Sequence, residues 1–223
     1  MATESSHMTE FISYLHGVYA NTNQHLLEQG KKRDQIITFY IVLLSFVLTN
    51  LENLDHDFFG KPTEMVIYFV LIIVGGIVLL NLADLRSWHT QYLDVIYVIN
   101  WTIAHYNEFD NVPKLQKKMK TLMKKPLNVK NKPPISSFGA WIKYWFFGST
   151  DNTVYTGMIF LISLPNFGFL SRTPLSLSAR IAIYIVILTS LLWYFERHLQ
   201  KVLKNSQAYN TWILSFDYNG KIK

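Results

Sequence analysis

The sequence contains no cysteine, and only 16% of its 223 residues are charged. The absence of cysteine excludes disulfide bonds, thiol catalysis and cysteine-ligated metal sites. Because an ordinary soluble domain carries about 25% charged residues, the low charge content argues against a soluble globular enzyme and against a disordered chain. Apolar residues are abundant instead, since 50% of the residues are hydrophobic and 15% are aromatic.

The apolar residues gather in four stretches. Three stretches contain no charged side chain, and the fourth contains only Arg180, near its start. A helix needs about 20 mostly apolar residues to cross a bilayer, and these stretches reach or approach that length. We therefore predict four transmembrane helices, at residues 35–51, 65–83, 152–171 and 175–195.

The predicted fold class is an all-α polytopic membrane protein with four transmembrane helices in two hairpins and amphipathic helices in the cytoplasm. Gly30 is expected to end the N-terminal helix, whereas no glycine or proline stops the second span from continuing beyond the membrane. The expected order is an N-terminal amphipathic helix (1–34), a first hairpin (35–86), a basic helical region with interfacial aromatic residues (87–150), a second hairpin (151–196) and a C-terminal tail (197–223).

The distribution of lysine predicts the orientation, because short loops rich in Lys and Arg stay in the cytoplasm. Nine lysines lie between the second and third spans, whereas the connection between the first two spans carries four acidic residues and one lysine. Every basic cluster falls on one side of the membrane if both termini are cytoplasmic. That is the topology we predict.

Residues 112–132 contain eight lysines and no acidic residue. Pro113 can start a helix here and Pro126 can stop it. A basic amphipathic helix is typical of a membrane-surface element, and an acidic protein is the alternative partner. Direct binding of nucleic acid is disfavoured, because no aromatic residue in this segment could stack on bases. The candidate residues for binding anionic lipid or a partner are Lys114, Lys117, Lys118, Lys120, Lys124 and Lys125.

The sequence shows no catalytic or metal-binding motif, and its seven histidines lack ligand spacing. We therefore predict no catalytic residue, no metal, no cofactor and no enzymatic activity. The first three spans lack ionisable groups, which argues against a proton-coupled transporter. Gly75 and Gly76 are candidate helix-packing residues, and Pro165 with Gly168 is expected to kink or shorten the third span.

One layout in the sequence is similar to that of known proteins. A short amphipathic helix, the basic cluster Lys31, Lys32 and Arg33, a two-span hairpin and a helix beginning LRSWHTQYLDVIYVINW follow one another within residues 8–110. This layout resembles the small multi-pass membrane subunits of bacterial antiphage systems, namely the two-span SLATT-type effectors and the four-span membrane subunit of Kiwa. The resemblance implies self-assembly in the bacterial inner membrane and a role in sensing infection or disrupting the membrane. The second hairpin departs from the two-span type, and no functional residue is carried over.

These observations favour an oligomeric inner-membrane protein that acts as a regulated pore or as a membrane-perturbing effector or sensor. Its expected partners are the lipid bilayer and further copies of itself. The alternative is a membrane anchor that recruits a soluble cytoplasmic partner through its basic face. A small-solute transporter ranks lower, because the residues that would couple transport to an ion are missing.

Overall fold

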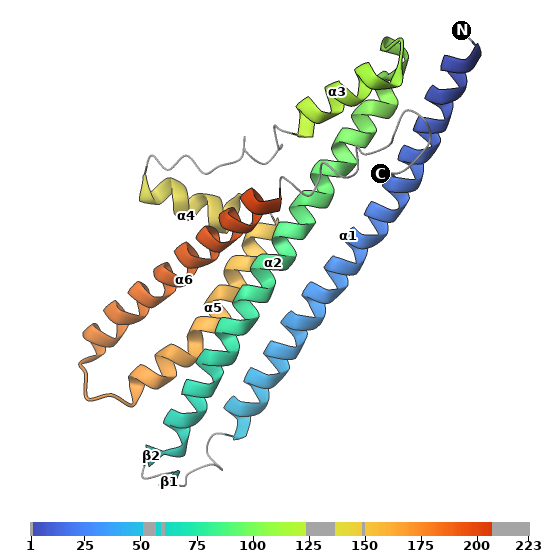
Figure 1. The fold of residues 1–223 in the computed structure, drawn as a ribbon. Helices are drawn as coiled ribbons and strands as arrows, with labels where there is room; N and C mark the ends of the chain where they lie inside the picture. The colour runs from blue at the N-terminus through green and yellow to red at the C-terminus, as the bar shows by residue number, and fades with distance from the viewer. Residues whose placement is uncertain (1, 51–56, 59–60, 124–136, 149, 207–223) are drawn as a thin grey trace. The chain divides into compact units, whose positions relative to one another are not determined.

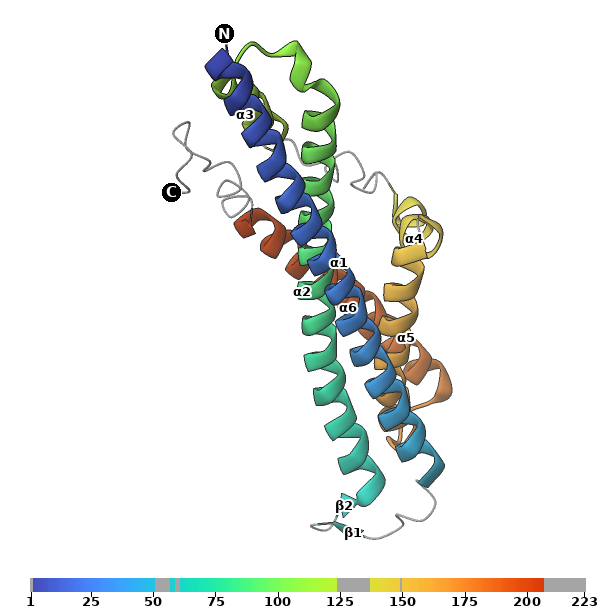
Figure 2. The same cartoon turned by 90° about the vertical axis from the view of Figure 1, so that its right-hand side faces the viewer.

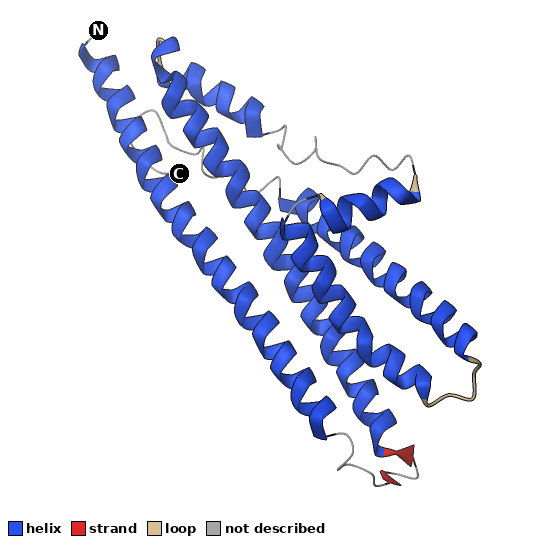
Figure 3. Cartoon of the chain, turned by 180° about the vertical axis from the view of Figure 1, so that it is seen from behind, coloured by secondary structure: helices blue, strands red, loops and turns tan. Residues whose placement is uncertain are grey.

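The computed structural model describes residues 2–50, 57–58, 61–123, 137–148 and 150–206, and these are almost entirely helical (Figure 3). Two-residue strands β1 (Asp57–Phe58) and β2 (Lys61–Pro62) pair antiparallel. The all-helical prediction is confirmed. The described helices are α1 (Ala2–Asn50), α2 (Thr63–His105), the short 3-10 helix η2 (Tyr106–Glu108), α3 (Val112–Met123), α4 (Phe138–Phe147), α5 (Thr150–Ser171) and α6 (Leu177–Ser206).

Helix α1 is continuous, so the prediction that Gly30 ends an N-terminal helix is wrong. An added Cβ at Gly30 would meet nothing within 4 Å, and the residue keeps ordinary helical geometry. A glycine inside a helix costs only about 1 kcal/mol relative to alanine. The apolar residues that α1 buries on both sides of Gly30, Phe11 and Leu15 before it and Tyr40 and Leu44 after it, can offset that cost. The predicted continuation of the second span is confirmed, since α2 runs unbroken from Thr63 to His105.

Three helical stretches are long and apolar enough to cross a bilayer, namely Thr63–Glu108, Asn152–Ser171 and Leu177–Lys201. They contain the second and third predicted spans and residues 177–195 of the fourth. The first predicted span, residues 35–51, is not among them; its described part, residues 35–50, forms the last section of the continuous helix α1. Residues 35–50 measure about 24 Å at 1.5 Å per residue, which is less than the roughly 30 Å hydrocarbon core.

The expected shortening of the third span at Pro165 does not occur, because α5 continues through this residue to Ser171. Gly168 makes room for a neighbouring helix. A Cβ at this position would lie 2.5 Å from the ring of Tyr68 on α2. Gly168 therefore allows the close approach of α2 and α5.

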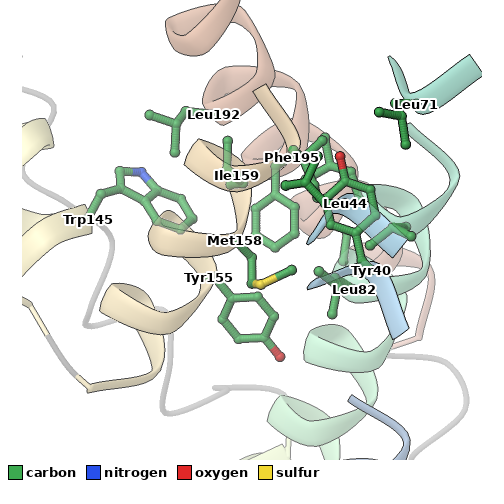
Figure 4. Packing of buried hydrophobic residues seen from close by; sticks show 14 residues of the cluster. Tyr40, Leu44, Leu71, Leu82, Trp145, Tyr155, Met158, Ile159, Leu192 and Phe195 are labelled. Carbon is green, nitrogen blue, oxygen red and sulfur yellow. The ribbon is translucent and has the colours of Figure 1, made fainter. Parts of the chain in front are cut away.

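The chain divides into two compact units, and α1 and α2 contribute to both of them. The first unit comprises Met1–Lys31, Arg86–Lys132 and Gln200–Lys223, and the second comprises Lys32–Leu85 and Pro133–Leu199. Each unit has its own apolar core. The core of the second unit draws on five helices, from Tyr40 and Leu44 of α1 to Leu192 and Phe195 of α6 (Figure 4).

Candidate functional site

The basic helix α3 buries its apolar side inside the first unit. Leu115 and Met119 are both 0% exposed. They belong to a cluster that also contains Phe11 and Leu15 of α1 and Ile99 of α2. The expected amphipathic helix is present, but its apolar face covers the protein's own helices. In this conformation that face is not available for insertion into a bilayer.

The described lysines of α3 lie on its exposed side. They are Lys114, Lys117, Lys118 and Lys120, whereas Lys124 and Lys125 lie outside the described residues. Lys114 Nζ donates a hydrogen bond of 2.7 Å to Asp110. This hydrogen bond and the lysine charge lower the pKa of the Asp110 carboxyl, and the same contact raises the pKa of Lys114. Asp110 therefore balances the charge of Lys114. The positive charges of Lys117, Lys118 and Lys120 remain on the exposed side of α3.

An aromatic residue accompanies the lysine row, although the segment 112–132 contains none. Lys118 Nζ lies 5.8 Å from the centre of the Trp101 ring, within the range of a cation–π contact. His105 stacks on Trp101 with a centroid distance of 4.6 Å. The histidine also places Nδ1 2.8 Å from the Trp101 carbonyl oxygen. Sequence reasoning missed this cluster, because α3 must fold back on α2 before Lys118 and Trp101 can meet.

The two candidate packing glycines differ in their surroundings. A Cβ at Gly75 would lie 2.8 Å from Ile162 Cγ2 of α5 and 3.1 Å from the Tyr40 hydroxyl of α1. A Cβ at Gly76 would meet nothing within 4 Å. Only Gly75 therefore lies where three helices of the second unit come together.

Polar side chains buried in the second unit form hydrogen bonds within the chain. Ser163, which is 0% exposed, lies 2.7 Å from the hydroxyl of Tyr184 and joins α5 to α6. The hydroxyl of Thr156 lies 3.0 Å from the carbonyl of Trp145 on α4 and 2.8 Å from the carbonyl of Asn152, and its single proton is shared between the two. These groups thus serve contacts between helices, which is the default role of polar residues in membrane helices.

Polar contacts also join the ends of the spans. His198 Nε2 lies 2.9 Å from Asp84 Oδ1, which links α6 to α2. At the start of α2, Glu64 forms an ion pair with Arg172, just after α5. The guanidinium of Arg180 donates 2.8 Å to the carbonyl of Thr173 and so closes the turn between α5 and α6.

The described residues contain no group of three or more metal-ligating side chains. Comparisons of the sequence with protein-family models, curated proteins and solved structures find no match.

Proposed function

We propose that the protein is a self-assembling membrane protein of the bacterial inner membrane, which acts as a regulated pore or a membrane-perturbing effector or sensor. In this proposal residues 35–51 also cross the membrane, as the first of four spans. The four spans form two hairpins, and both termini are cytoplasmic. The resemblance to antiphage membrane subunits favours a role in antiviral defence.

The observation that carries the proposal is the uncovered apolar surface of the spans. Phe46 on α1 is 67% exposed, Phe69 on α2 is 56% exposed and Val186 on α6 is 62% exposed. Soluble proteins rarely leave such continuous apolar faces in water, so lipid or further copies of the chain must cover them. The buried polar groups Ser163 and Thr156 bond within the chain, so a conducting path would have to form between copies.

Two measurements test this proposal together. The protein purified in mild detergent should have the mass of a homo-oligomer by light scattering. Its expression should depolarise bacterial cells, as reported by a potential-sensitive dye. A monomer that leaves the membrane potential unchanged would contradict the proposal.

The exposed lysines of α3 favour a second candidate function, a membrane anchor that recruits an acidic soluble protein. The burial of Leu115 and Met119 turns Lys117 and Lys118 toward solvent, where they can meet a partner. The double variant Lys117→Glu with Lys118→Glu should then lose a co-purifying protein and keep its oligomeric mass. Lys201→Glu, an exposed charge reversal on α6, serves as the control. Loss of depolarisation without loss of a partner would favour the effector over the anchor.

A further inference from the structure

Helix α4 is joined to the start of α5 by several hydrogen bonds. The last carbonyls of a helix have few partners within that helix. Here Gly148 N–H donates to the Tyr144 carbonyl, and polar side chains of α5 donate to the last carbonyls as well. Asn152 Nδ2 donates 3.1 Å to the Tyr144 carbonyl, and the hydroxyl of Thr153 donates 2.9 Å to the Phe146 carbonyl. The hydroxyl of Thr156 also lies within hydrogen-bond distance of the Trp145 carbonyl. Figures 1 and 2 show α4 lying across the beginning of α5.

The inner side of α4 is held by α6 as well. The ring of Trp145 is 1% exposed and meets Phe195 edge-on at 5.9 Å. One turn earlier, Trp141 Nε1 donates 2.9 Å to Glu196. These contacts set the orientation of α4 about its own axis, with Trp141 and Trp145 on the side that faces α6.

The outer side of α4 is apolar at its end and basic one turn before. Phe147 is 80% exposed, Phe146 is 42% exposed and Lys143 is exposed. On α5, Val154 is 38% exposed directly after Thr153, the residue that bonds to the Phe146 carbonyl. Two turns beyond Thr153, Phe160 is 47% exposed.

The length of α5 places this surface at the edge of the bilayer. The candidate span Asn152–Ser171 has 20 residues, which correspond to about 30 Å of helix. That is the thickness of the hydrocarbon core, so the whole stretch is needed to cross it. The end of α4 then lies at the level where aromatic residues insert and where a lysine reaches lipid phosphates with its extended side chain.

We propose that α4 is a lipid-inserted interfacial helix. Phe146 and Phe147 enter the acyl chains of the leaflet from which α5 starts, and Lys143 pairs with phospholipid phosphates there. This inference rests on the membrane placement proposed above. The contacts of Trp141 and Trp145 would pass a change in the packing of that leaflet to α6.

The absence of cysteine makes a direct test straightforward, since a single introduced cysteine carries a spin label at one place. Full-length Phe147→Cys is labelled with a nitroxide and reconstituted in vesicles of phosphatidylethanolamine and phosphatidylglycerol. Collisions with apolar oxygen are then compared with collisions with a water-soluble nickel chelate. Ile185→Cys on the exposed face of α6 is the lipid control, and Lys117→Cys on α3 is the water control.

We expect oxygen to dominate over nickel at 147, as at 185, and nickel to dominate at 117. Nickel dominance at 147 with oxygen dominance at 185 would overturn the inference and leave the membrane placement intact. Low collision rates with both reagents and spin–spin broadening at 147 would identify a second copy as the occupant and would also overturn it. Nickel dominance at 185 would refute the membrane placement itself. Phe146→Cys repeats the test if Phe147→Cys does not fold.

Discussion

Two adjacent glycines in α2 allow the helix packing of the second unit to be tested with a matched pair of variants. Gly75→Ala and Gly76→Ala make the same chemical change in the same helix, one residue apart. Replacing glycine with alanine favours the helix by about 1 kcal/mol, and this contribution is common to both variants. The difference between their stabilities therefore reports the surroundings of the added methyl group.

The structure predicts opposite outcomes for the two variants. At Gly76 the methyl group meets nothing within 4 Å, so only the gain in helix propensity remains. At Gly75 it would lie 2.8 Å from Ile162 Cγ2. That atom belongs to a β-branched side chain, which is stiff in a helix. Tyr40, whose hydroxyl lies 3.1 Å from the new methyl group, is completely buried and has little room to withdraw.

Overpacking of this kind costs about 1–3 kcal/mol, so Gly75→Ala should be less stable than Gly76→Ala by that amount. For a chain of this size 1 kcal/mol corresponds to about 2–4 °C in the unfolding midpoint. The assay heats detergent-solubilised protein and measures the fraction that still elutes as folded protein from a size-exclusion column. If Gly75→Ala melts at the same temperature as Gly76→Ala or above it, the close approach of α1, α2 and α5 at Gly75 is wrong.

Two further predictions concern single polar contacts. Tyr184→Phe removes the hydroxyl that bonds to Ser163 and should lower stability in the same melting assay by about 1 kcal/mol, the scale of hydrogen bonds between membrane helices. Thr189→Val is its control, since that hydroxyl bonds only within α6, and equal losses in the two variants would count against the α5–α6 contact. The second prediction concerns pH. Lys114 lowers the pKa of Asp110, so the ion pair persists above the ordinary carboxyl pKa and is lost as the pH falls through the lowered value. Lys114→Gln should therefore raise the titration midpoint of Asp110, measured by NMR of carboxyl-labelled aspartate, and an unchanged midpoint would contradict the pairing.

The helical class and the positions of the apolar helices were predictable from residue types alone. The stretch 65–83 has no charged side chain, and lipid admits a spanning segment only when the helix satisfies its own backbone groups. That requirement is local, so the sequence carries it directly. The continuity of α2 was equally local, because no glycine or proline interrupts residues 81–110.

Signals that depend on a single residue were less informative. Gly30 looked like a helix end, yet α1 continues through it, because the cost of one glycine is small beside the packing of a long helix. Gly168 was expected, together with Pro165, to kink or shorten the third span; α5 is not shortened, and a Cβ at Gly168 would lie 2.5 Å from the Tyr68 ring. In both cases the sequence shows the residue and not what lies beside it.

The sequence by itself therefore determined the class of the protein, the solvent its helices suit and the basic character of α3. The tertiary structure alone decided how these features are used: that α3 buries Leu115 against α1 and α2, that Gly75 rather than Gly76 lies at a helix contact, and that α4 turns Phe147 outward. The physical reason is the separation along the sequence between the residues that interact. Burial in lipid and helix formation depend on neighbours a few positions away, whereas Ser163 with Tyr184 or Trp141 with Glu196 meet only after the chain has folded back on itself.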